Sequence, residues 1–276
     1  IQVGDVHDPL LRQVLPLHAE TETTRGYVTD PVGDAAAALG AGVLHKYRGR
    51  ALLITTGACA IHCRYCFRRH YPYAADNAVR HWEAMLERLR GMPDIDEVIL
   101  SGGDPLSLAD QRLQDLLGEL EHLPQLRRLR VHTRLPVVLP ARITPALSEL
   151  LGNCRLATSM VIHCNHPNEL HTALHEPLAR LRAAGVTLLN QAVLLAGVND
   201  NAATQVALSE ALFDYGVLPY YLHLLDPVQG AAHFAEPASV ARQIATTLRA
   251  QLPGYLVPRL VREIPGEPSK TPFPAM

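Results

Sequence analysis

Short apolar runs alternate with amphipathic stretches of helical length along most of the chain after residue 51. Such runs are typical of buried strands, and the stretches between them carry apolar residues at helical spacing. The predicted strands are 52–55, 97–100, 129–133, 156–162, 187–195, 220–225 and 256–261, and the predicted helices are 77–90, 107–122, 144–151, 176–184, 202–215 and 237–251. Regular alternation of strands and helices predicts an α/β fold with a parallel sheet, here a partial (β/α)6-type barrel.

The first 45 residues lack this regular pattern. Asp8-Pro9 and Asp30-Pro31 indicate turns between short helices. We therefore predict an N-terminal helical arm over residues 1–45 and one barrel domain over residues 46–276. Within the barrel, Gly185 and Gly216 are predicted to end helices.

Composition narrows the class of protein. The chain of 276 residues is 48% hydrophobic, which is enough for one large domain. Its net charge of −2 gives no sign of a nucleic-acid-binding surface, and no apolar run reaches the roughly 18 residues of a membrane span. The N-terminal residues do not show the pattern of a secretory signal. The five cysteines are odd in number and three are clustered, so we expect a reducing, cytoplasmic location rather than a disulfide framework.

The clustered cysteines are Cys59, Cys63 and Cys66, spaced C-x3-C-x2-C directly after the first predicted strand. Thiolates are soft ligands that select zinc, copper(I) or iron–sulfur clusters. A [4Fe–4S] cluster takes four ligands, so three thiolates leave one iron free to bind another molecule. The alternatives are a zinc site completed by His62 or His70, or an oxidised cysteine pair.

Polar residues follow the other predicted strands as well. In a parallel barrel the active site forms where the strands end at their carboxyl side. The candidates are Ser101-Gly102-Gly103-Asp104, His132-Thr133-Arg134, His163 to Glu169, Asn190-Gln191, Asp226 and Glu263. Paired glycines allow close approach of a ligand to the backbone, and Asp104 could accept a hydrogen bond from an ammonium group. Each has an ordinary alternative, because Gly-Gly-Asp-Pro also forms plain turns and a single histidine is commonly structural.

Only two of the 25 basic residues are lysines, Lys46 and Lys270. If the protein carries pyridoxal phosphate (PLP), only these two can form the Schiff base. Lys46 precedes the first predicted strand, whereas Lys270 follows the last one, on a Gly/Pro-rich loop at the end where the other candidates gather. The pattern favours Lys270, and the alternative is an exposed tail residue.

Several long motifs resemble the lysine 2,3-aminomutase family of PLP-dependent radical S-adenosylmethionine (SAM) enzymes. They cover roughly residues 40–276 in the family's order. They are the cysteine loop (residues 59–66), Ser101–Leu106, 135–144, His166-Pro167-Asn168-Glu169, 190–200 and Pro219-Tyr220-Tyr221. Within the family, 44–47, 63–70 and 263–270 are most similar to the bacterial branch that makes β-lysine for elongation factor P.

The resemblance implies three cofactors and a role for each matching residue. Cys59, Cys63 and Cys66 would hold a [4Fe–4S] cluster, and Lys270 would carry PLP. The other cofactor-binding residues would be Gly102, Gly103 and Asp104 along the methionine part of SAM, His163 and Gln191 at SAM or PLP, and Tyr47 and Arg50 near the PLP phosphate. Arg68 would bind the carboxylate of the lysine substrate, and Asp226 and Glu263 its distal ammonium. The family's usual residue at the last position is Asp, and Cys154 and Cys164 have no implied role.

The implied activity is conversion of L-α-lysine to β-lysine. Its implied partners are an electron donor of flavodoxin or ferredoxin type, elongation factor P and the lysyl-transferase of that pathway, and a homo-oligomer is compatible with the family. One alternative is a free-lysine mutase of catabolism or osmolyte synthesis. A lysyl-transferase-like gene beside this one would favour the elongation factor P pathway over that alternative. The other alternative is a zinc-stabilised binding protein without catalytic activity.

Overall fold

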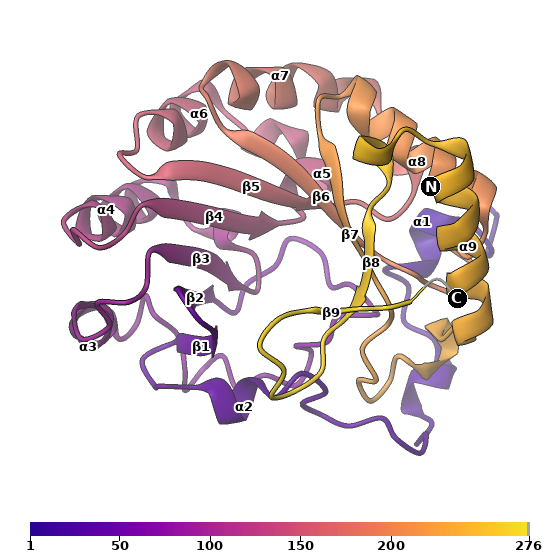
Figure 1. Ribbon diagram of the computed structural model, residues 1–276, viewed down its shortest axis with the longest axis horizontal. Coiled ribbons are helices and arrows are strands. Elements are labelled where there is room, and N and C mark those ends of the chain that lie inside the picture. Colours follow the sequence, from indigo (N-terminus) through magenta and orange to yellow (C-terminus); the bar gives the residue numbers. More distant parts are fainter. Residues whose placement is uncertain (275–276) are drawn as a thin grey trace.

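A curved nine-stranded sheet with helices along its outer side forms the body of the computed structural model, which describes residues 1–274 (Figure 1). The strands lie in sequence order. Strands β2 to β8 are parallel, whereas β1 pairs antiparallel with β2, and β9 pairs antiparallel with β8. The strands are β1 (Val43–Tyr47), β2 (Arg50–Thr56), β3 (Glu97–Gly102), β4 (Arg128–Thr133), β5 (Ala157–His163), β6 (Thr187–Val193), β7 (Leu218–His223), β8 (Arg259–Arg262) and β9 (Thr271–Pro272).

The longer helices connect successive parallel strands and cover the convex side of the sheet (Figure 1). They are α3 (Trp82–Arg90), α4 (Asp110–Glu121), α6 (Pro145–Gly152), α7 (His175–Ala183), α8 (Ala202–Asp214) and α9 (Ala238–Gln251). Three short helices complete the list: α1 (Pro9–Arg12), α2 (Asp34–Ala37) and α5 (Leu135–Val138). The predicted α/β partial barrel is therefore confirmed.

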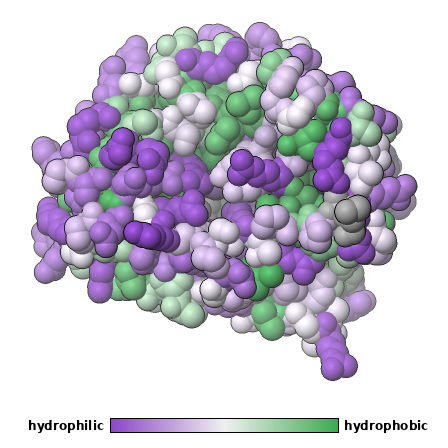
Figure 2. All heavy atoms as spheres, in the orientation of Figure 1, coloured by the Kyte–Doolittle hydropathy of each residue, from purple (hydrophilic) through white to green (hydrophobic). Residues whose placement is uncertain are grey.

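The surface mixes hydrophilic and hydrophobic side chains, which are interspersed over the face in Figure 2. Among residues 1–274, no helix combines the length and the apolar character needed to cross a bilayer.

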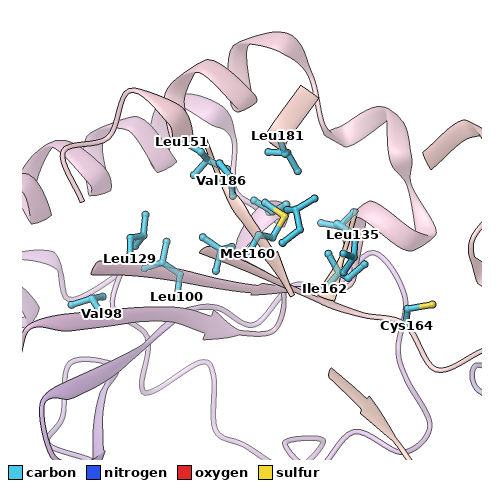
Figure 3. Close-up of a cluster of buried hydrophobic side chains, with 14 of the residues drawn as sticks. Val98, Leu100, Leu129, Leu135, Leu151, Met160, Ile162, Cys164, Leu181 and Val186 are labelled. Carbon is cyan, nitrogen blue, oxygen red and sulfur yellow. The ribbon is translucent and has the colours of Figure 1, made fainter. Parts of the chain in front are cut away.

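Period-two alternation along the strands separates an apolar outer face from a polar inner face. Met160 and Ile162 of β5 point toward the covering helices and are fully buried there (Figure 3). His163, the next residue of the same strand, lines a cavity on the inner side. Because side chains alternate across a strand, each strand that packs the core also presents polar groups to the barrel interior.

The N-terminal arm is joined to the sheet more closely than predicted. The predicted boundary after residue 45 falls inside β1, which the sequence pattern did not indicate. The short helices expected in the arm are present as α1 and α2. The last two residues of the predicted barrel domain lie outside the described range.

Two helices begin later than their patterns predict. The helix expected from residue 77 begins at Trp82, because Ala78 donates its backbone N–H to Ile54 O of β2 at 2.7 Å and is held in a turn. The helix expected from residue 107 begins at Asp110, because residues 105–107 form a short 3-10 turn capped by the Asp104 side chain. Thr144, the first residue of the helix predicted over 144–151, caps α6, and Gly185 and Gly216 have the positive φ angles typical of helix ends.

Gly42 is the tightest backbone contact beside β1. Its φ is 72°, and an added Cβ would lie 2.2 Å from Ala78 N. We expect Gly42→Ala to lower the free energy of unfolding by about 3 kcal/mol or more, because it combines left-handed strain with a backbone clash. Gly118→Ala is the control, since that helical glycine has no atom within 4 Å and the exchange should stabilise the protein by about 0.5–1 kcal/mol. Urea unfolding of both variants measures the difference, and equal midpoints would contradict the expectation.

Candidate functional site

Two cavities meet inside the curve of the sheet. The first, about 420 Å³, is lined by the cysteine loop and the ends of β3 to β6, and we call it the cysteine cavity. The second, about 170 Å³, is lined by both lysines and by inner residues of β1 to β7, and we call it the lysine cavity. Their walls share a set of residues, so the cavities adjoin; among those shared are Arg68, His163, Gln191 and Asp226. Of the predicted site residues, Cys59, Cys63, Cys66, Gly102, Gly103 and Asp104 line the first cavity, and Tyr47, Arg50, Glu263 and Lys270 line the second.

The three cysteines are unpaired thiols on the wall of the cysteine cavity. Burial raises the pKa of Cys59 to about 12, with further contributions from Asp104 and the other two cysteines, and burial raises the pKa of Cys66 to about 11. Forming the thiolates here therefore costs free energy unless a positive charge lies beside them, such as the iron of a cluster.

The donor set fits an iron–sulfur cluster. Such a cluster carries its own sulfide and is bound by cysteine thiolates through separate irons. Three thiols on one cavity wall, with no disulfide among them, fit a cluster in number and in chemistry.

The carboxylate of Asp104 already accepts hydrogen bonds from other groups of the chain. Its Oδ1 accepts hydrogen bonds from Thr133 Oγ1 at 2.7 Å and Leu106 N at 3.0 Å, and its Oδ2 accepts from Arg134 N at 2.8 Å and Leu135 N at 3.1 Å. A carboxylate has about four acceptor positions, so the predicted hydrogen bond from a ligand's ammonium to this side chain is not supported. Asp104 instead ties the end of β3 to the end of β4.

The two glycines before Asp104 also serve the packing of the chain. A Cβ on Gly102 would lie 2.7 Å from Thr56 O, and one on Gly103 would lie 2.4 Å from Ala58 O. They let the end of β3 pack directly against the start of the cysteine loop. Both glycines also line the cysteine cavity, so the close approach predicted for a ligand stays a prediction.

Arg134 was a strand-end candidate without an assigned role, and in the structure it contacts the cysteine loop. Its Nη1 donates to Cys63 Sγ at 2.9 Å, and its Nη2 donates to Glu169 Oε2 at 2.9 Å and to Gln13 Oε1 at 2.7 Å. Gln13, just after α1 in the arm, is fully buried. No sequence pattern pointed to Gln13, because its role depends on where the arm docks.

Both lysines line the lysine cavity, so position does not separate them, and the preference for Lys270 stays a prediction. Lys46 lies on β1 near the amino end of β2, but its side chain enters the interior and donates to Glu263 Oε1 at 2.9 Å. Lys270 Nζ donates to Oε2 of the same carboxylate at 2.6 Å. Lys46 also pairs with Asp34 Oδ1 at 2.7 Å.

Arg68 is buried and already has one acidic partner. Its Nε donates to Asp34 Oδ2 at 2.6 Å and its Nη1 donates to Ser101 Oγ at 3.0 Å. The guanidinium lines both cavities and has five N–H donors, so these two bonds leave donors for a ligand carboxylate. Asp34, which lies in the arm, is a further site residue that the sequence pattern did not reveal.

Several polar atoms in the shared interior lack a partner within the described chain. Gln191 Oε1, Arg50 Nε and His223 Nε2 are buried without a hydrogen bond. Buried polar groups are almost always paired, so unpaired ones at a cavity indicate a bound molecule. The Arg50 guanidinium lies 4.8 Å from the Tyr47 ring centre, and its unpaired Nε donor suits an anionic group such as a phosphate.

The histidines of this interior are neutral. Burial lowers the pKa of His163 to about 3, and burial also holds the pKa values of His132 and His223 well below their ordinary range. Nearby Arg68 and Lys270 act in the same direction for His163 and His132. His163 and His132 approach to 3.5 Å between Nε2 and Nδ1, so they serve as neutral hydrogen-bonding groups.

Comparison with known proteins gives a consistent result. A family model described as the Radical SAM superfamily matches residues 53–207. The chain is 52% identical to the L-lysine 2,3-aminomutase of Escherichia coli (strain K12), with 99% of this chain and 80% of that protein covered. It is 49% identical to the enzyme of the same name from Haemophilus influenzae, with 98% and 80% covered. A radical SAM methyltransferase structure from Sphaerobacter thermophilus shares the fold, with a TM-score of 0.50, 19% identity, and coverage of 80% of this chain and 68% of that one.

Asp226 should make the free energy of unfolding depend on pH. Burial, with the nearby charge of Glu263, raises the pKa of Asp226 to about 7. A carboxyl group whose pKa is higher in the folded state stabilises the fold at low pH, and this stability is lost as the pH rises from about 4 through about 7. We expect the cofactor-free protein to lose about 2–4 kcal/mol over this range relative to Asp226→Asn, which does not titrate. Urea unfolding of both proteins across the range measures it, and parallel pH profiles would contradict it.

Proposed function

The chain belongs to the L-lysine 2,3-aminomutase family of the radical SAM superfamily, and from this we propose that it moves the amino group of L-lysine from the α-carbon to the β-carbon. The single observation that best supports this reaction is the meeting of the cysteine cavity and the lysine cavity at a shared wall. A radical formed on one side has to reach a substrate held on the other, and adjoining cavities allow that transfer without passage through water.

The cysteine cavity is proposed to hold the [4Fe–4S] cluster and SAM. Cys59, Cys63 and Cys66 would bind three irons, with Gly102 and Gly103 beside the methionine part of SAM and with His163 and Gln191 at the shared wall. A reduced cluster with SAM would supply the radical chemistry, with electrons from a donor of flavodoxin or ferredoxin type. The chain's own part is to hold the donors in place, and the Arg134 hydrogen bond fixes the position of Cys63.

The lysine cavity is proposed to hold PLP. Lys270 would join its carbonyl carbon, and Tyr47 and Arg50 would lie near its phosphate, where the unpaired Arg50 Nε supports an anionic ligand. PLP supplies a conjugated ring that carries the migrating nitrogen and spreads unpaired spin.

Substrate lysine is proposed to bind through its two ends. Arg68 would pair with the carboxylate, for which a planar guanidinium is well suited. Asp226 and Glu263 provide the negative charge for the distal ammonium. Holding both ends leaves one C–H bond of the β-carbon facing the shared wall, and this orientation is the chain's main contribution to rate.

We propose the elongation factor P pathway, with its lysyl-transferase, as the consumer of the β-lysine. The support is the similarity of the cysteine loop and the 263–270 segment to that branch, together with the high identity to the Escherichia coli relative. A free-lysine mutase of catabolism is the second candidate.

Turnover tests the proposed reaction directly. The anaerobically reconstituted protein, given labelled lysine, SAM, PLP and a reductant, should form β-lysine. Cys59→Ala, Cys63→Ala and Cys66→Ala should each lose the cluster and cleave no SAM, because the motif has no spare thiolate. Cys154→Ala is the control, since Cys154 lines neither cavity. Normal SAM cleavage in any of the three variants, or a colourless zinc-loaded wild type, would refute the cluster assignment.

Peptide mapping tests the choice between the two lysines. Borohydride reduction of the PLP-loaded protein should leave the pyridoxyl group on Lys270. Lys270→Ala should lose the visible absorbance of attached PLP and keep its cluster, because the cluster ligands lie in the other cavity. Lys46→Ala is the matched comparison, since Lys46 reaches the same carboxylate. A pyridoxyl label on Lys46 would reverse the assignment.

A further inference from the structure

Cys63 differs from the other two cysteines of the loop in its hydrogen-bond partners. Its Sγ accepts a hydrogen bond from Arg134 Nη1 at 2.9 Å and a second one from the Tyr65 hydroxyl. Cys66 Sγ accepts from the backbone N–H of Arg68, and among residues 1–274 no donor is recorded at Cys59 Sγ. The three thiols therefore have unequal surroundings, and two side-chain donors meet at Cys63.

The direction of the hydrogen bond between Tyr65 and Cys63 follows from the other contacts of the hydroxyl. The Tyr65 oxygen accepts from Arg134 Nη1 at 2.5 Å and from Asn165 Nδ2 at 2.7 Å. Asn165 is fixed in this orientation, because its Oδ1 accepts from Val193 N at 2.8 Å. A hydroxyl has two acceptor positions and one hydrogen, so two incoming donors leave that hydrogen for the sulfur.

Arg134 is held with its guanidinium against the cysteine loop. Its Nη2 donates to Glu169 Oε2 at 2.9 Å and to Gln13 Oε1 at 2.7 Å, and its backbone N donates to Asp104 Oδ2 at 2.8 Å. The side chain is buried, and a guanidinium keeps its positive charge at any ordinary pH. Arg134 is therefore a fixed cation beside the sulfur of Cys63.

Donors at the sulfur of a cluster ligand affect how readily the cluster is reduced. On reduction one electron passes from an external reductant to the cluster, without a proton, so the cluster and its sulfur ligands gain one negative charge. Hydrogen bonds to those sulfurs stabilise the more negative state, and they are among the features that set the reduction potential. Two donors at one sulfur, one of them cationic, thus favour reduction.

We propose that Arg134 and Tyr65 are positioning residues that make the cluster easier to reduce, and that they act through Cys63. This inference rests on the proposed function, since it needs the three loop cysteines to hold a [4Fe–4S] cluster. It also gives the N-terminal arm a part in reduction, because Gln13 of the arm holds the guanidinium in place.

The first test is a redox titration of the cluster-loaded protein without SAM or PLP. At the wild-type midpoint potential, Arg134→Gln should show a ratio of reduced to oxidised cluster about tenfold lower, which is a midpoint about 59 mV lower for one electron. Tyr65→Phe should lower the ratio about threefold, or about 28 mV. Arg134→Lys should lie between wild type and Arg134→Gln, because it keeps the charge without the planar pair of donors. Arg142→Gln is the control and should match wild type, since Arg142 is also hydrogen-bonded within the chain but lines neither cavity.

The second test detects the hydrogen bond from Arg134 itself. With nitrogen-15 in the guanidinium groups of arginine only, pulsed electron paramagnetic resonance of the reduced cluster should show a nitrogen-15 coupling, because Nη1 lies 2.9 Å from Sγ. Arg134→Lys should lack this coupling, and Arg142→Lys should keep it. An unchanged coupling in Arg134→Lys would contradict the assignment of Arg134.

The midpoint potential also separates this role from a purely structural one. A structural role would lower the iron and sulfide content per protein without moving the midpoint of the clusters that remain. Tyr65→Phe removes a single oxygen atom, so it decides the outcome if Arg134→Gln binds no cluster. Wild-type midpoints in Tyr65→Phe and in every cluster-loaded Arg134 variant would overturn this inference and leave the proposed function intact. A wild-type protein that assembles no [4Fe–4S] cluster would overturn both.

Discussion

A line of alternating charges runs through the interior, and it holds together the elements around the two cavities. Lys270 pairs with Glu263, Glu263 with Lys46, Lys46 with Asp34, and Asp34 with Arg68. Charged groups are tolerated in a protein interior only when they are paired, so none of these side chains is stable here without its neighbours. The line joins Asp34 of the arm, Lys46 of β1 and Arg68 just after the cysteine loop to Glu263 and Lys270, about 200 residues later in the sequence.

This line also explains why the arm matters. Asp34 comes from α2 of the arm and holds the arginine proposed to bind the substrate carboxylate. On the other side of the interior, Gln13 from the arm shares the Arg134 guanidinium with Glu169, next to Cys63. The arm thus binds two arginines that line the cavities, Arg68 through Asp34 and Arg134 through Gln13, and it orients them.

The interior combines fixed charges with neutral hydrogen-bonding groups. The charged groups, among them Arg68 and Glu263, set where a charged amino acid can bind, while His163 and His132 are uncharged hydrogen-bonding groups at the shared wall. This combination suits radical chemistry, in which the substrate needs firm orientation at both ends and the reacting carbon needs an environment free of side reactions.

The sequence alone determined the parallel sheet, the cysteine loop and most of the residues that line the cavities. These follow from local rules: apolar runs make strands, and residues at strand ends and on inner faces meet in a barrel. Only the tertiary structure decided which hydrogen-bond and ion-pair partners those residues have. From the sequence, Asp104 is a free acceptor, but in the structure four donors surround it. From the sequence, Lys46 is remote from the site, but β1 directs its side chain into the interior. Gln13 and Asp34 carried no signal, because a partner more than 30 residues away in sequence is chosen by packing, and a local pattern holds no information about it.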